Sequence, residues 1–461
     1  MKHKGEARRM RKCALLRLAV CCILLCLLPS FAYAGQYGAP VGTPEVPPEI
    51  QDTFDAALLL ERSTKAVLYQ KDTERVFSPT GSAVNLMTAY ILRQEADFEQ
   101  EIPVIDAVES LSSGARKVGL KPGQRWLIKD LVATFLLYGA QDAALVLCDH
   151  VCGTEEAFVA RMNEYAQSLG MENTVYKNCL GAYAQEQVST VSDLMLLCEA
   201  VLRDDILRGM LGKSTYDAIN GKTIENRMEI MQDGQESFDA RIRGIGEGAT
   251  EEAGANILLY AVDGDQAWLF VGYRKDDDQR ASEKHAITLL NYGSQAYHTL
   301  DITPLVENML QRLKITTEDG GSVSLAGGAA GYKISAEASL AREIGSDTGV
   351  FSLGELPRLE TAPEKGAAIG TVWLQWAEQN VLEIPLLAGV VTPPSGTGAQ
   401  PQDKREENNL EIPVYTVEDW PGADREQRFT TLYGSWIIIG AATLLAAIIL
   451  LWAHRLRPGK R

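Results

Sequence analysis

Two apolar segments, one near each end of the 461-residue chain, most constrain how it folds. Segment 435–453 contains an uncharged stretch of 18 residues, Trp436 to Ala453, which is long enough to cross a hydrocarbon core of about 30 Å. A tryptophan lies at each end of the stretch, and four basic residues follow it. The positive-inside rule therefore predicts a single transmembrane helix with the basic tail 454–461 in the cytoplasm.

Residues 1–34 have the pattern of a signal peptide. A basic start precedes an apolar stretch from Cys13 to Leu28, and Phe31 to Ala34 supply the small-x-small sequence that signal peptidase requires. We expect cleavage near Gly35, with an uncleaved anchor as the alternative. The two ends together predict a single-pass protein of the cell membrane whose main part is extracytoplasmic.

The extracytoplasmic part is strongly acidic. The whole chain carries −17, and the two ends carry +6 and +4, which leaves −27 for residues 35–453. A domain with this net negative charge binds nucleic acid poorly, and we therefore expect no nucleic-acid partner. The acidity is compatible with cations or basic wall polymers as neighbours, but it also serves solubility alone.

The cysteines and histidines predict neither a metal nor a cofactor. Four cysteines remain after removal of the signal peptide, and Cys148 and Cys152 are one helical turn apart. A metal pair needs two further ligands at suitable spacing, and the sequence offers none. Buried free thiols are the simpler interpretation.

The central part of the chain predicts a domain of mixed α/β structure over residues 51–298, preceded by a Pro- and Gly-rich linker, 35–50. The pattern predicts two strands within Ala56–Tyr69, a helix over Asn85–Leu92, one long helical region over Lys129–Val151, and a hairpin centred on Asp263-Gly264-Asp265. Thr154–Leu169 is the best amphipathic helix, with Thr154 as its N-cap.

Residues 299–392 change character. Short apolar runs alternate with turns rich in Gly, Asp and Pro, which predicts a small all-β sandwich domain. Residues 393–434 are polar and rich in Pro, Gly, Gln and Glu, so we expect a flexible spacer between that domain and the membrane.

Seven short segments follow one another over about 240 residues: Leu86 to Ala89, Gln141 to Ala144, Phe158 to Asn163, Leu169 to Thr174, Ser189-Thr190 with Asp193, Glu251 to Gly254, and Leu289 to Gly293. In this order they resemble the serine D-Ala-D-Ala carboxypeptidases, which are the low-molecular-mass penicillin-binding proteins. Leu356 to Leu387 is similar to the C-terminal β-domain of that family. The resemblance implies the α/β (α+β) fold shared by serine β-lactamases and DD-peptidase transpeptidases.

The resemblance also implies an acyl transfer in which a serine attacks and a lysine one helical turn later takes its proton. This first motif, S-x-x-K, falls on Ser82 to Asn85, so the nucleophile position keeps its serine and Asn85 replaces the lysine. A carboxamide has no basic nitrogen. No lysine of the chain has a serine three residues before it. Ser82 as a mere helix N-cap is the alternative interpretation.

The second and third motifs are also altered. The second, S-x-N, falls on Gly139-Ala140-Gln141, so Gln141 stands at the asparagine position and the hydroxyl is lost. The third, K-T-G, falls on Gly246-Glu247-Gly248, so Glu247 stands at the threonine position. We expect Glu247 to repel a substrate carboxylate. A shift of register that lets Arg241 or Arg243 supply the missing cation is an alternative.

Decay of three motifs beside a preserved scaffold predicts a catalytically impaired member of the family, a pseudoenzyme in peptidoglycan metabolism. It would bind stem peptide or a wall-synthesis protein at the membrane. The alternatives are an active serine-type D-Ala-D-Ala carboxypeptidase that uses Ser82 with an unconventional base, and a purely architectural ectodomain.

Overall fold

The computed structural model describes residues 37–328, 331–340, 351–376 and 378–392. The predicted signal peptide, spacer, transmembrane helix and cytoplasmic tail lie outside these ranges. Within them, no helix is both long enough and apolar enough to cross a bilayer.

A five-stranded antiparallel sheet forms the centre of the first domain, in the order β2-β1-β9-β8-β7. The two predicted hairpins are both confirmed. In the first, the carboxylate of Glu61 accepts hydrogen bonds from Ser63 Oγ and Thr64 N, which closes the turn. The strands are β1 (Ala56–Glu61), β2 (Ala66–Lys71), β7 (Ile242–Thr250), β8 (Gly254–Asp263) and β9 (Gln266–Arg274).

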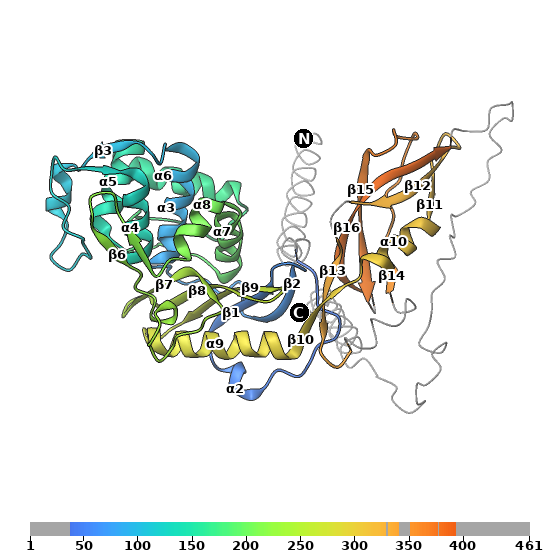
Figure 1. Ribbon diagram of the computed structural model, residues 1–461, viewed down its shortest axis with the longest axis horizontal. Helices are drawn as coiled ribbons and strands as arrows, with labels where there is room; N and C mark the ends of the chain where they lie inside the picture. Colours follow the sequence, from blue (N-terminus) through green and yellow to red (C-terminus); the bar gives the residue numbers. More distant parts are fainter. Residues whose placement is uncertain (1–36, 329–330, 341–350, 377, 393–461) are drawn as a thin grey trace, which may run out of the picture. The chain divides into compact units, whose positions relative to one another are not determined.

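Both faces of this sheet are buried, which explains why β1 is a continuous apolar run. Leu58 and Leu60 pack into the core beneath the helices α3 to α8, whereas Leu59 packs on the other face with Leu289 of α9 (Gln279–Ala296). Figure 1 shows α9 along one face of the sheet and the helices α3 to α8 over the other. The alternation follows from the two-residue period of a strand.

The helical layer surrounds α3, whose first eleven residues are buried except for Tyr90. The predicted N-cap is confirmed, since Thr154 Oγ1 accepts a hydrogen bond from Ala157 N at 3.1 Å. The helices are α3 (Ser82–Glu95), α4 (Ile128–Tyr138), α5 (Gln141–Cys152), α6 (Glu155–Ser168), α7 (Val191–Arg203) and α8 (Asp205–Leu211).

The single helical region predicted over Lys129–Val151 is wrong in one respect, because it consists of two helices. Gly139 adopts a left-handed conformation, φ 76°, and its N–H donates to Phe135 O at 3.0 Å, which ends α4. Glycine takes this conformation without steric cost and commonly ends a helix. The break matters for function, because it lies at the second motif.

Short elements join these parts. They are α2 (Pro48–Gln51), β3 (Glu101–Pro103) paired with β4 (Arg125–Leu127), the 3-10 helices η1 (Asp106–Ser110) and η2 (Glu229–Met231), and β5 (Thr215–Asp217) paired with β6 (Thr223–Glu225). In the predicted linker, Val41 and Ile50 are buried, and Gly38 N donates to Lys65 O at 2.9 Å.

The predicted β-rich region contains a second antiparallel sheet of five strands, in the order β11-β12-β16-β15-β14. Its strands are β11 (Lys314–Thr316), β12 (Ser322–Gly327), β14 (Phe351–Leu353), β15 (Ala368–Trp376) and β16 (Gln379–Thr392). A separate pair joins β10 (Tyr297–Asp301) to β13 (Lys333–Glu337).

The prediction of an all-β domain missed a helix, α10 (Thr303–Arg312). Its buried residues, Val306 and Leu310, are four positions apart and join the core of this domain. The sequence signal for this helix is Pro304 in its first turn, because proline favours the start of a helix.

Candidate functional site

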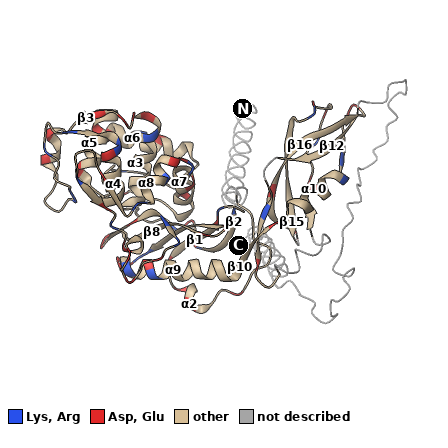
Figure 2. Cartoon of the chain, viewed as in Figure 1, with Lys and Arg blue, Asp and Glu red and all other residues tan. Residues whose placement is uncertain are grey.

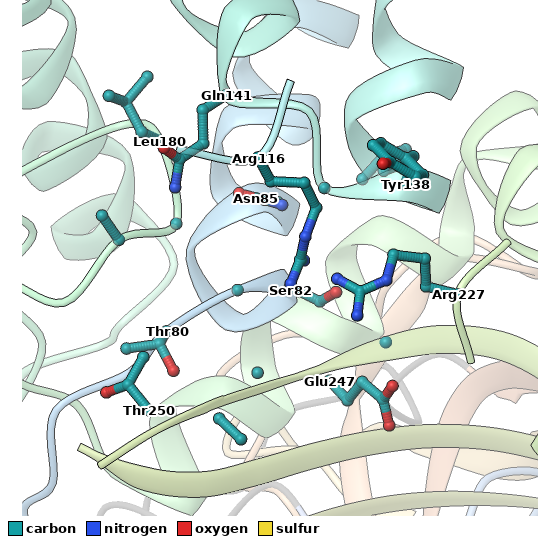
Figure 3. Close-up of a pocket in the computed structure, with 18 of the residues that line it drawn as sticks. Thr80, Ser82, Asn85, Arg116, Tyr138, Gln141, Leu180, Arg227, Glu247 and Thr250 are labelled. Carbon is teal, nitrogen blue, oxygen red and sulfur yellow. The ribbon is translucent and has the colours of Figure 1, made fainter. Parts of the chain in front are cut away.

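The three altered motifs meet around one cavity of about 300 Å³ in the first domain. Ser82, Asn85, Gln141 and Glu247 all line it. Figure 3 shows these side chains together with others of the lining. The volume is at the lower end of the range of small-molecule sites. The cavity is therefore not filled by side chains, and it has room for a short peptide segment or a small anion.

Ser82 is the first residue of α3 rather than its N-cap, so the interpretation of Ser82 as a capping residue is wrong. Gly81 takes the capping position, without a side-chain hydrogen bond, and Gly81 N donates to Gly181 O at 2.7 Å. Ser82 is 9% exposed. Among the residues that the structure describes, none forms a hydrogen bond with its Oγ.

Asn85 lies one turn further along α3 and is 3% exposed. Its Nδ2 donates to Phe135 O at 3.4 Å, while its Oδ1 is buried without a hydrogen-bond partner. No lysine or histidine occurs among the described residues that line the cavity. The site therefore offers the hydroxyl of Ser82 no amine or imidazole to take its proton.

Strand β7 lies directly against Ser82. A Cβ placed on Gly246 would overlap with both the Cβ and the Oγ of Ser82. The lysine that the third motif requires at this position therefore has no room unless the strand moves. The close approach of β7 to Ser82 thus depends on the glycine that stands in place of this lysine.

Glu247, the next residue of β7, faces α9 because successive side chains of a strand point to opposite faces. Gln279 Nε2 of α9 donates to Glu247 Oε1, and Oε2 is buried without a partner. Burial, and then the nearby carboxyl of Glu283, raise the pKa of Glu247 well above its usual value, while Arg227 opposes the shift. The neutral acid is favoured, so the repulsion that we expected for a substrate carboxylate is weakened.

The second motif occupies the break between α4 and α5. Gln141 begins α5, and no described residue forms a hydrogen bond with its side-chain amide. A Cβ placed on Gly139 would lie 2.8 Å from Arg116 Nη1. The guanidinium of Arg116 thus fills the space where a serine side chain would begin.

Two cations of the lining, Arg116 and Arg227, were missed by the sequence analysis. Both belong to connecting segments without a recognisable motif, so only the tertiary structure brings them to the cavity. The two arginines considered as alternatives do not line it. Arg241 pairs with Asp239 at 2.6 Å, and Arg243 Nη1 donates to the carbonyl of Ala240.

The described residues contain no cluster of three or more side chains suited to a metal ion. Cys148, Cys152, Cys179 and Cys198 are free thiols in the structure, and three of them are buried. Burial raises the pKa of the Cys148 and Cys198 thiols well above their usual value, which disfavours reactive thiolates.

Comparison with known proteins assigns this geometry to a family. The model of the D-alanyl-D-alanine carboxypeptidase family matches residues 43–271. The carboxypeptidase DacC of Escherichia coli is 27% identical over 344 residues, which cover 72% of this chain and 82% of that protein. DacA of the same organism is 26% identical over 296 residues, 62% of this chain and 71% of DacA.

Solved structures show the same fold. Penicillin binding protein 5 from Haemophilus influenzae aligns with a TM-score of 0.60 at 19% identity, over 76% of this chain and 100% of that one. Penicillin binding protein 6B from Escherichia coli aligns with a TM-score of 0.57 at 21% identity, over 76% and 99%. The chain therefore belongs to the D-alanyl-D-alanine carboxypeptidase family, the low-molecular-mass penicillin-binding proteins of cell-wall metabolism.

Proposed function

We propose that this chain is a membrane-anchored, catalytically impaired member of the family that binds peptidoglycan stem peptide or a wall-synthesis protein. One observation carries the proposal: Ser82 has neither an amine nor an imidazole beside it in the cavity, among the described residues. The arginines of the lining do not replace the base, because a guanidinium group offers hydrogen-bond donors and no acceptor.

The magnitude of this loss argues against efficient hydrolysis. Removal of a general base lowers the rate by about 10²- to 10⁴-fold. The contact between Gly246 and Ser82 adds a steric cost, because an acyl group that reaches Oγ must displace the strand or enter from another side. Glu247 does not replace the base, since its side chain points toward α9, where Gln279 Nε2 donates to its Oε1.

A fluorescent penicillin tests the proposal, because such a reagent acylates the serine of an active member. The purified full-length chain and its Ser82→Ala variant should both remain unlabelled after long incubation, and neither should release D-alanine from a pentapeptide. An active family enzyme in the same buffer serves as the positive control. Labelling of the wild-type chain that disappears in Ser82→Ala would show instead that an unconventional base activates the serine.

The terminal segments support the anchored location. Trp436 to Ala453 is apolar and uncharged, and basic residues follow it. This arrangement favours an extracytoplasmic peptidase-like domain and a short cytoplasmic tail.

A further inference from the structure

Two arginines, Arg116 and Arg227, line the cavity, against a single acidic side chain, Glu247, among the described lining residues. Neither Arg116 nor Arg227 forms a side-chain hydrogen bond or an ion pair with any described residue. By contrast, Arg62 and Arg93 of the same domain form ion pairs, with Glu199 and Asp204 respectively. Residues 35–453 carry a net charge of −27, so two unpaired guanidinium groups in one cavity stand out.

The backbone around Arg116 is fixed by the start of α5. Gln141 N donates to Arg116 O at 2.8 Å. The buried carboxylate of Asp142 accepts hydrogen bonds from the backbone N–H groups of Val118, Gly119 and Leu120, at 2.9 to 3.2 Å. These bonds hold the segment that carries Arg116 against the second motif.

The backbone of Arg227 is fixed independently by α4, because Arg227 N donates to Leu137 O at 3.0 Å. The neighbouring Asn226 is buried, and its Nδ2 donates to Lys213 O at 2.9 Å. Two separate segments therefore direct an arginine to the same cavity. In Figure 3 both guanidinium groups point toward the part of the cavity where Ser82 lies.

The charges around the cavity favour an anion. Among the described lining residues Glu247 is the sole acidic one, and its neutral form is favoured. Figure 2 shows acidic and basic segments interspersed over the helical layer. Gln141 adds a carboxamide without a partner of its own in the described chain.

We infer that Arg116 and Arg227 bind the oxyanion group of a ligand, a carboxylate or a phosphate, on the second-motif side of the cavity. The inference rests on the proposed function, because it assumes that the cavity binds a ligand without cleaving it. Guanidinium groups match both oxyanions with paired hydrogen bonds. The anion is thus held by segments attached next to the second motif, and not by the third motif, which has lost its cation.

The test uses the purified full-length chain and three probes, measured by calorimetry at low salt. The probes are N-acetyl-D-Ala-D-Ala, its C-terminal amide, and inorganic phosphate. An oxyanion probe should bind, and the amide should bind at least about 10-fold more weakly than the acid if the peptide carboxylate is the ligand. Binding should weaken as the salt concentration rises.

Arg116→Gln and Arg227→Gln should each lower the affinity for the oxyanion probe by about 10- to 100-fold, which is the usual effect of losing a charged hydrogen bond. Both side chains are exposed and unpaired, so the variants should fold, which thermal melting checks. Arg243→Gln is the matched control, because Arg243 is also exposed and carries the same charge but does not line the cavity.

The outcomes separate this inference from the proposed function. If phosphate binds through both arginines and neither peptide binds, the oxyanion site stands and the stem-peptide assignment fails. If acid and amide bind equally well and the arginine variants change nothing, peptide binding stands and the oxyanion site is refuted. Absence of binding by every probe at millimolar concentration also refutes it.

Discussion

At the scale of single residues, the site departs from the family motifs at positions where the motifs have two lysines and a hydroxyl. Asn85 stands at the lysine position within α3, and its Nδ2 donates a hydrogen bond to Phe135 O. Gly246 replaces another lysine, and Gly139 replaces a hydroxyl whose space Arg116 now fills. Each change alters a side chain of a motif, and none removes the helix or strand that carries it.

Glu247 gives a prediction for the dependence of stability on pH. Burial and Glu283 raise its pKa in the folded state, so the folded chain binds this proton more tightly than the unfolded chain does. Its contribution to stability is fully present below the unfolded pKa and is lost as the pH rises through the folded pKa. Glu247→Gln should therefore raise the free energy of unfolding at pH 8 by about 1–3 kcal/mol and leave it nearly unchanged at pH 4.

Urea unfolding of both proteins between pH 4 and pH 9 measures this difference. Glu236→Gln is the control, and its effect on the free energy of unfolding at pH 8 should have the opposite sign. The reason is that Lys284 lowers the pKa of the exposed Glu236 carboxyl. Parallel loss of stability with rising pH in the wild-type chain and in Glu247→Gln would contradict the assignment of Glu247 as a buried neutral acid.

At the scale of elements, the decisive contact is between β7 and the first turn of α3. Asn256 of β8 supports it, because its Nδ2 donates both to Thr80 Oγ1 at 3.2 Å and to Gly248 O at 3.0 Å. The segment before Ser82 is thereby joined to the strand two residues beyond Gly246. The close approach belongs to the packing of the whole strand rather than to one side chain.

This contact predicts that Gly246→Ala destabilises the fold. The added methyl group would overlap with Ser82, and such overpacking costs about 1–3 kcal/mol. Gly209→Ala is the matched control, because Gly209 is in α8 and a Cβ there meets nothing within 4 Å. That variant should be more stable than wild type by about 0.5–1 kcal/mol.

A double-mutant cycle locates the cost at Ser82. Addition of Ser82→Gly to Gly246→Ala removes the side chain that the new methyl group meets, so part of the lost free energy of unfolding should return. Equal destabilisation by Gly246→Ala in the presence and absence of the Ser82 side chain would show that the contact seen at this position is not the source of the strain.

At the scale of the whole molecule, the chain combines a family fold with terminal segments that suit a membrane. The peptidase-like domain keeps the sheet, the surrounding helices and a cavity at the expected place, while the chemistry at that place has changed. A binding role requires the cavity and the fold, and it does not require a base.

The anchoring proposal predicts how the chain distributes in cells. The full-length chain should remain with the membrane fraction after washing with high salt and be released by detergent, since burial of an apolar helix does not depend on ionic strength. A chain that ends at residue 434 should be recovered in the extracytoplasmic soluble fraction. Retention of the shortened chain on membranes after the salt wash would place the anchor elsewhere.

The sequence by itself determined the elements whose signals are local. The hairpin of β1 and β2, the hairpin of β8 and β9, and the Thr154 cap of α6 follow from alternation, turn residues and capping chemistry within a few positions. Motif spacing also identified Ser82, Asn85, Gln141 and Glu247, and all four line one cavity.

Only the tertiary structure decided what surrounds those four residues. Arg116 and Arg227 reach the cavity through bonds to Gln141 N and Leu137 O, which lie 25 and 90 positions away in the chain. The overlap of Gly246 with Ser82 joins positions 164 residues apart. Local patterns cannot report such contacts, because they arise from the packing of strands and helices that are distant in sequence, and it is this packing that closes β7 on the serine and gives the cavity its positive wall.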